Sequence, residues 1–437
     1  MGKPSAPGPQ EKRLAAYVEG LAKAAGHADR HAPLKAYCAG LLLPGERKSV
    51  EPMAARLAPE NVRRMHQCLH HLVAEAPWSD EAILESVRGQ VLTAMKQSGP
   101  VAAWIVDDTG FPKKGTHSVG VARQYCGQLG KQDNCQVAVS MSVATHHASL
   151  PVAWRLYLPE SWASDQQRRK AVKVPEEVGF QTKPMIALEQ IRQAVAREVP
   201  RAPVLADAGY GHETRFREGL TELGLRYVVG VQENTTVWRP GEVPPRRPRK
   251  GRGRPPTRLY RNADHQPVSV QQLALEVPGR AWKTVTWREG TRHKLRSRFT
   301  AVRVRPAHRD HLRSEPYPEE WLLIEWPTSE AEPTKYWLST LPAQSTLTAL
   351  VRLAHHRWII ERDYEELKQE LGLGHYEGRG WRGFHHHATL CIAAYGFLVI
   401  ERTRFSPSAR AGRLELRAPG IPPHFQPRGS TRARRTA

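Results

Sequence analysis

The stretch Val101-Ala-Ala-Trp-Ile-Val-Asp107-Asp108-Thr-Gly110 decides how this chain is interpreted, because a short apolar run ends in two acidic residues. Such a run predicts an interior strand, and neighbouring residues on a strand point to opposite faces. We therefore expect only one of Asp107 and Asp108 to enter a site at the sheet edge. Asp207 closes a second apolar run in the same way, shortly before a Gly-Tyr-Gly turn.

A third acid lies in a strongly helical segment, Arg357-Trp-Ile-Ile-Glu361, with Lys368 further along. At roughly 100° per residue, the spacing places Arg357, Glu361 and Lys368 on one stripe of the helix. A salt-bridged surface helix would show the same pattern. An adjacent apolar stripe would seat this helix on the sheet, and its members are Ile360, Tyr364, Leu367 and Leu371.

Two strand-end acids and one helix acid predict a site for divalent cations. Carboxylate oxygens are hard ligands that suit Mg²⁺, which also keeps waters and binds substrate phosphate. Two such ions would activate an attacking water or 3′-hydroxyl and stabilise the leaving oxygen. The pattern therefore favours metal-dependent phosphodiester chemistry.

The composition points to a polyanionic partner. The chain has 437 residues and a formal net charge of +22. This charge could reflect an arginine-rich composition alone, but the candidate catalytic acids lie within the basic sequence, which favours nucleic acid as the partner. Five scattered cysteines without a Cys-x-x-Cys pair support neither a disulfide framework nor a zinc site. We find no signal-peptide core and no membrane-spanning run, so we expect a bacterial cytoplasmic protein associated with the nucleoid.

The texture of the sequence changes several times along the chain and predicts an α/β fold with a mixed sheet, flanking helices and an inserted β-rich subdomain. The first segment is helical and is either a DNA-binding domain or a scaffold for the core. We divide the chain into a helical N-terminal segment (1–99), a first catalytic part (100–239), a basic loop with a β-rich insertion (240–345), a second catalytic part (346–405) and a basic, disordered tail (406–437).

Several basic and aromatic residues are candidates for DNA contact. Arg252-Gly-Arg254-Pro has the look of an AT-hook, although a generic phosphate-binding loop is the favoured interpretation. Trp321 and Trp326 could stack on an unpaired base but are more typical of core packing. His386 or His387 could approach phosphate. Lys113, Lys114 and Arg123 line the DNA path or belong to plain surface.

Four motifs together resemble a known family. They are Asp107-Asp-Thr-Gly-Phe-Pro-Lys-Lys-Gly, Ser118-Val-Gly-Val-Ala-Arg-Gln-Tyr-Cys-Gly, Ala206-Asp-Ala-Gly-Tyr-Gly and Arg357-Trp-Ile-Ile-Glu-Arg-Asp-Tyr-Glu-Glu-Leu-Lys368. Over roughly residues 30–400 the chain resembles the acidic-triad (DDE) transposases of bacterial insertion sequences, in particular the IS-four-like and IS-seven-oh-one-type group. The last motif is similar to the family's tyrosine–arginine–glutamate–lysine signature, but Ala354 stands at the tyrosine position.

The resemblance implies an RNase H-like core in which Asp108, Asp207 and Glu361 are the catalytic, metal-binding triad. Asp108 is preferred to Asp107 because the family acid directly precedes threonine, and Glu365 is the fallback for Glu361. Two more residues of the signature, Arg357 and Lys368, would hold DNA phosphates.

The same resemblance implies a transposase that binds terminal inverted repeats, cleaves there and joins 3′-hydroxyl ends to target DNA. It implies Mg²⁺, with Mn²⁺ as a substitute, no nucleotide cofactor, double-stranded DNA as partner, and a homodimer or higher oligomer on DNA. The alternatives are an RNase H-like nuclease without strand joining and a repurposed, non-catalytic DNA-binding protein.

Overall fold

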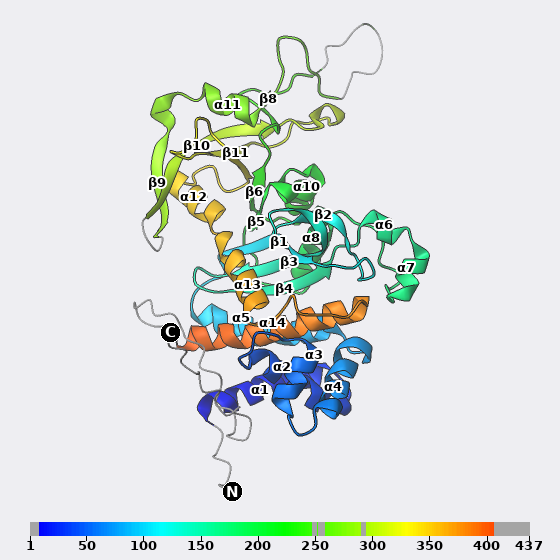
Figure 1. Cartoon of the computed structure of the whole chain (residues 1–437). Helices are drawn as coiled ribbons and strands as arrows, with labels where there is room; N and C mark the ends of the chain where they lie inside the picture. The colour runs from blue at the N-terminus through cyan, green and yellow to red at the C-terminus, as the bar shows by residue number, and fades with distance from the viewer. Residues whose placement is uncertain (1–7, 247–250, 252–257, 290–293, 406–437) are drawn as a thin grey trace, which may run out of the picture.

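The fold is described from a computed structural model, which covers residues 8–246, 251, 258–289 and 294–405. Within these residues the elements form three tiers, with helices from the N-terminus at one end, a sheet in the middle and the insertion at the other end (Figure 1). Arg252, Arg254 and the tail from 406 lie outside the described residues, so the expectations for them are not addressed by the structure.

The N-terminal tier is helical, as the sequence predicts. Ser79 caps one of its helices by accepting a hydrogen bond from the backbone N–H of Ala82 at 3.1 Å. The elements are α1 (Pro9–Ala24), η1 (Ala28–Arg30), α2 (His31–Leu42), α3 (Val50–Leu57), α4 (Val62–His70), η2 (His71–Glu75) and α5 (Asp80–Gln97).

The middle tier contains the strands that the sequence places around the acids. Strands β1 and β3 pair antiparallel, β3 and β4 form a hairpin, and β1, β5 and β6 are parallel neighbours. The elements are β1 (Ala103–Pro112), β2 (Ala122–Cys126), β3 (Lys131–Ala144), β4 (Ser149–Leu156), α6 (Glu160–Ala163), α7 (Gln166–Ala171), α8 (Lys183–Ala196), β5 (Val204–Ala206), α9 (Ala208–Gly211), α10 (Thr214–Glu222) and β6 (Tyr227–Val231).

The insertion is β-rich, as expected, but its strands continue the central sheet. The described strands run in the order β2-β3-β1-β5-β6-β12-β11-β10-β7-β8, and β12 pairs antiparallel with β6. The elements are β7 (Thr236–Trp238), β8 (Val268–Ser269), α11 (Val270–Glu276), η3 (Gly279–Ala281), β9 (Lys283–Glu289), β10 (Lys294–Pro306), η4 (Asp310–Leu312), β11 (Glu320–Trp326) and β12 (Lys335–Ser339).

Within the described residues, three helices follow β12 and cover the sheet: α12 (Leu347–His355), α13 (Trp358–Gln369) and α14 (Trp381–Arg404). In Figure 1, α14 runs between the sheet and the N-terminal helices. Among the described residues α14 alone is long and apolar enough to cross a membrane, but 94% of its apolar window is buried inside the protein. It is therefore packed as a core helix, contacting N-terminal residues such as Tyr17, whose hydroxyl donates to the Ala393 carbonyl at 2.7 Å.

Candidate active site

Both acids of the first motif lie within β1 rather than at its end, which corrects the sequence-based expectation. The antiparallel ladder with β3 continues to Pro112, so Asp107 and Asp108 have strand partners on that side. The parallel pairing with β5 stops earlier, at Ile105. The two acids therefore follow the end of the β5 ladder, where the strand backbone is open toward the Asp207 turn.

Asp107 points to the face of the sheet covered by α13. Its carboxylate oxygen Oδ2 lies 2.5 Å from Nη1 of Arg357, and 15% of its side chain is exposed. Burial raises the pKa of Asp107 to about 7; Arg357 lowers it, while Asp207 and Asp108 raise it further. A carboxyl group with this pKa is partly protonated near neutral pH. A neighbouring cation such as Arg357 therefore increases the fraction of Asp107 that is charged.

Asp108 points to the opposite face, toward α8. Its Oδ2 accepts hydrogen bonds from Lys183 Nζ and from the Tyr210 hydroxyl, both at 3.1 Å. Strand alternation explains why the two neighbours separate in this way. The sequence argument that only one of them enters the site is consistent with these contacts, but the contacts place Asp107, not Asp108, on the α13 face.

Asp207 caps the short helix α9 directly after β5. Its Oδ1 accepts the backbone N–H of Gly209 at 2.9 Å. The turn lies tightly against β6, because a Cβ added to Gly230 would meet the backbone nitrogen of Ala208 at 2.8 Å. Only glycine tolerates this close backbone approach, which fixes the Asp207 turn beside β6.

Arg357 connects the three acids. Besides Asp107, its Nη2 lies 3.6 Å from Oε1 of Glu361, the i, i+4 pair expected on one helix stripe. Burial lowers the pKa of Arg357, but Asp107, Asp207 and Glu361 outweigh it and raise the value. The negative charges of all three carboxylates therefore stabilise the charged guanidinium of Arg357.

The carboxylates do not form a closed metal cage. In the described part of the chain, no three His, Cys, Asp or Glu side chains lie close enough together to hold an ion. The immediate reasons are that Asp108 is bound to Lys183 and Tyr210 and that 67% of the Glu361 side chain is exposed. The donor types nevertheless suit Mg²⁺, because Asp107, Asp207 and Glu361 are carboxylates, and each raises the pKa of the same Arg357 guanidinium.

A hollow of about 340 Å³ is lined by two of these acids, Asp207 and Glu361. The tip of β5 and the helices α12 and α13 surround it, and Asp207, Arg357 and Glu361 are among its lining residues. Its lining includes three aromatic residues, Tyr336 and Trp337 of β12 and Trp358 of α13. The site is thus open on one side to a ligand of considerable size.

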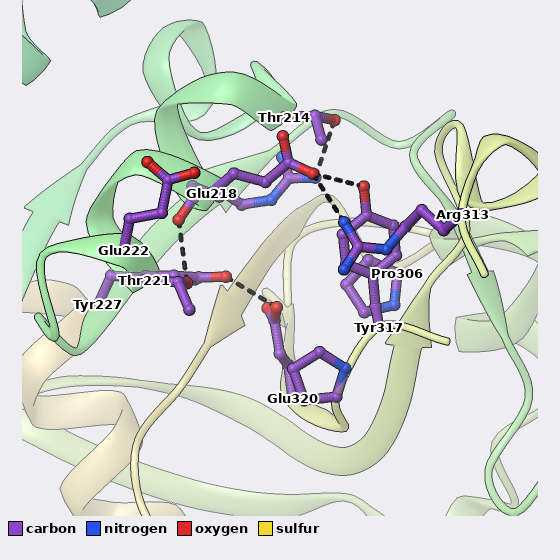
Figure 2. Close-up of a pocket in the computed structure, with 11 residues that line it drawn as sticks. Thr214, Glu218, Thr221, Glu222, Tyr227, Pro306, Arg313, Tyr317 and Glu320 are labelled. Atoms are coloured by element: carbon purple, nitrogen blue, oxygen red, sulfur yellow. Dashed lines mark hydrogen bonds and ion pairs between the residues drawn. The ribbon is translucent and has the colours of Figure 1, made fainter. Parts of the chain in front are cut away.

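A second hollow, also of about 340 Å³, lies where α10 and β6 meet the insertion (Figure 2). At its base the Tyr227 hydroxyl donates to Oε1 of the buried Glu320 at 2.8 Å. Nearer the rim, Glu218 accepts from the Tyr317 hydroxyl at 2.8 Å and pairs with Arg313 at 3.3 Å. None of the three predicted acids lines it, so we do not regard it as the reaction site.

The predicted helix is present and seated as expected. Ile360, Tyr364 and Leu367 are buried, and the Tyr364 hydroxyl is 2.7 Å from Oγ of Ser140 on β3. Lys368, predicted on the charged stripe with Arg357 and Glu361, donates a hydrogen bond to the Gly110 carbonyl at 2.8 Å. Burial lowers the pKa of Lys368 to about 8. Glu365 is exposed and outside the lining of the hollow.

The remaining predicted DNA contacts divide into exposed and enclosed residues. Lys114 and Arg123 are exposed. Lys113 is partly buried and donates to the Tyr376 carbonyl at 2.9 Å, so it ties the end of β1 to the segment before α14. Trp321 and Trp326 each donate an indole N–H to a backbone carbonyl, of Pro342 and Glu330 respectively, which is consistent with packing.

The expectation that His386 or His387 could approach phosphate is wrong. Both are buried in α14, where only 3% and 1% of each residue is exposed. His386 stacks on Trp78 with ring centroids 3.6 Å apart, and His387 contacts the Tyr37 hydroxyl at 2.8 Å. Burial lowers the pKa of both imidazoles to about 4, so they are neutral core residues.

Sequence reasoning did not identify Lys183 and Tyr210 as part of the site. Tyr210 belongs to the Ala-Gly-Tyr-Gly turn, and its position three residues after Asp207 was a usable signal. Lys183 begins α8, and no local pattern connects it with Asp108. Both contacts depend on how α8 and α9 pack against β1.

Similarity to known proteins indicates the family of this chain. A profile of the DDE superfamily endonucleases matches residues 20–294, more than half of the chain. The chain belongs to the DDE superfamily of endonucleases. The matched range contains Asp107, Asp108 and Asp207 and ends before Glu361.

A curated relative narrows the likeness. The chain is 31% identical over 193 residues to a probable transposase for insertion sequence element IS701 from Microchaete diplosiphon. The alignment covers 44% of this chain and 46% of the relative, so the match spans about half of that protein's length. The mixed sheet with flanking helices is consistent with the RNase H-like fold of the DDE superfamily.

Proposed function

We propose that this protein is a DNA transposase that binds the ends of its own element, cleaves there and joins the 3′-hydroxyl ends to target DNA. The observation that carries the proposal is that Arg357 pairs with Asp107 and Glu361 and lines a hollow together with Asp207 and Glu361. The net charge of +22 supports a DNA substrate.

The metal ligands in this proposal are Asp207, Glu361 and Asp107. Asp107 replaces Asp108 as the first acid, because it pairs with Arg357, which also pairs with Glu361 and has its pKa raised by Asp207. Asp108 remains the alternative favoured by its position before threonine. When bound, Mg²⁺ would activate the attacking oxygen and stabilise the leaving one.

The protein residues have roles of their own. Arg357 balances the three carboxylates before metal binds and is placed to contact a DNA phosphate afterwards. Lys368 anchors α13 to the Gly110 backbone, with its ammonium also 3.2 Å from Oε1 of Gln128. Lys114 and Arg123 would follow the DNA backbone, and end synapsis would require a homodimer or higher oligomer.

The decisive experiment supplies pre-cut end DNA and a plasmid target with Mg²⁺, Mn²⁺ or EDTA. Joined products that require the metal support the transposase. Cleavage without joining supports a nuclease with the same core, and sequence-specific binding without either reaction supports a repurposed DNA-binding protein. Asp207→Asn is the matched control, because it removes one charge from the site without changing side-chain size.

A further inference from the structure

Helices α3 and α4 form a pair whose dimensions are typical of a helix-turn-helix. They contain eight and nine residues, and residues 58–61 connect them. In DNA-binding proteins with this motif, a turn of three or four residues joins two short helices and the second enters the major groove. No sequence pattern indicated the motif, because its turn, Ala58-Pro-Glu-Asn61, lacks the glycine that often marks it.

Helix α2 supports the pair closely. A Cβ added to Gly40 of α2 would meet Sδ of Met53 at 3.1 Å and Cδ1 of Leu57 at 3.2 Å, so α2 and α3 cross with little space between them. On α4, the buried Leu69 faces this interior. The three helices therefore form a small bundle that fixes the orientation of α4.

The opposite side of α4 is exposed and carries no negative charge. Arg63, Arg64 and Gln67 are exposed and recur at helical spacing, which places them on one face. Among the described residues, the side chains of Arg63, Arg64 and Gln67 have no ion pair or hydrogen bond. Residues 61–74 contain no aspartate or glutamate. In Figure 1, α4 lies at the outer edge of the N-terminal helices.

We propose that α4 enters the major groove of the element's end DNA and reads its sequence through Arg63, Arg64 and Gln67. An α-helix about 10–12 Å across with its side chains matches a groove about 12 Å wide. Arginine pairs in bidentate fashion with guanine and glutamine with adenine. This inference rests on the proposed function, since the end DNA is the ligand that a transposase must recognise.

The test measures sequence preference without catalysis. The wild-type chain selects duplexes from a random-sequence library in EDTA, and the affinity for the selected duplex is compared with that for an unselected one. We expect Arg63→Ala and Arg64→Ala each to reduce this ratio roughly five- to hundredfold. Gln67→Ala should relax the preference at one base pair and leave the affinity for unselected DNA unchanged.

Lys12→Ala and Lys23→Ala are the matched controls, because both lysines are exposed on α1, outside the α3–α4 pair. They remove the same charge and should leave the ratio within about twofold. Thermal unfolding of every variant verifies that the fold is retained, as expected for exposed positions.

Three results would overturn the inference. The wild-type chain could select no sequence, the α4 variants could retain the wild-type ratio, or they could weaken both duplexes equally, which would make α4 a phosphate contact only. Failure of the proposed function looks different. A chain that reads DNA through α4 but joins no ends would refute transposase activity and leave this inference standing.

Discussion

The adjacent carboxylates Asp107 and Asp108 lie on opposite faces of β1 and differ in burial and in bonding partners. Asp107, on the α13 face, is mostly buried against Arg357, and its pKa is raised to about 7. Asp108, on the α8 face, is more exposed and is held by Lys183 and Tyr210. The difference teaches that adjacent acids in one motif need not share a role, because strand alternation separates them before any chemistry is considered.

Removing an acid from the α13 face should have the largest effect. We expect Asp107→Asn, Asp207→Asn and Glu361→Gln each to slow strand cleavage by roughly 100- to 1000-fold, the scale for losing an electrostatic group at a reacting centre. Asp108→Asn should cost less than about tenfold. Single-turnover cleavage of end DNA measures these rates. A larger loss for Asp108→Asn than for Asp107→Asn would reverse the assignment of the two faces.

The pH dependence of metal binding provides a second way to compare the faces. Because Asp107 has a pKa raised to about 7 and must be deprotonated to bind an ion, Mn²⁺ affinity should increase as pH rises from 6 to 8. Arg357 lowers this pKa, so Arg357→Gln should move the midpoint to higher pH. Mn²⁺ titrations followed by electron paramagnetic resonance measure it. A pH-independent affinity would contradict the role of Asp107.

The cation on the α8 face should matter less for catalysis. Lys183→Gln removes the ammonium bound to Asp108, and we expect cleavage to fall less than about fivefold because Tyr210 still holds Asp108. Arg357→Gln serves as the comparison on the α13 face and should cost more. Parallel cleavage assays at saturating DNA measure both. Equal reductions in cleavage rate for Lys183→Gln and Arg357→Gln would mean that the two faces of β1 contribute equally to catalysis.

The smallest effect concerns how α13 is seated. Asp363 is fully buried and accepts from the Tyr395 hydroxyl at 2.7 Å, and burial raises its pKa to about 6. This folded-state value exceeds the unfolded value of about 3.9, so the charge opposes folding. The contribution of Asp363 to stability should therefore be greatest below about pH 4 and be lost as pH rises through 6.

Asp363→Asn should remove this dependence and raise the unfolding midpoint at pH 8 by a few degrees, from roughly 2–3 kcal/mol at most. Thermal unfolding at pH 5 and pH 8 tests the prediction. A variant less stable than wild type at both pH values would show that the Asp363 carboxylate stabilises the docked helix.

Much of the architecture was predictable because apolar periodicity determines strands and helices locally. The β3–β4 hairpin, β11 and the seating of α13 by Ile360, Tyr364 and Leu367 all follow from such patterns. The continuation of the sheet through β12 was not predictable, because it depends on pairing between β6 and a strand about 100 residues later.

In the candidate site, too, local features could be predicted from the sequence, whereas features that depend on the packing of distant segments could not. Motif and spacing predict Asp207, Glu361 and Arg357 as site residues, but the sequence gives no signal for which side of β1 faces α13. That choice depends on the register of β1 against β3 and β5. The opposite error occurred at His386 and His387, where a run of polar residues looked accessible although the helix that carries them is buried on all sides.

Helix α14 is a single rod of about 36 Å that belongs to both the N-terminal tier and the sheet. If α4 contacts bases in one tier while the carboxylates act in the other, the packing of α14 against both tiers fixes their relative position. The number of base pairs between the recognised sequence and the cut phosphate is then set by the protein. Adding or removing a few base pairs in that interval should therefore abolish DNA cleavage without lowering the affinity for the recognised sequence.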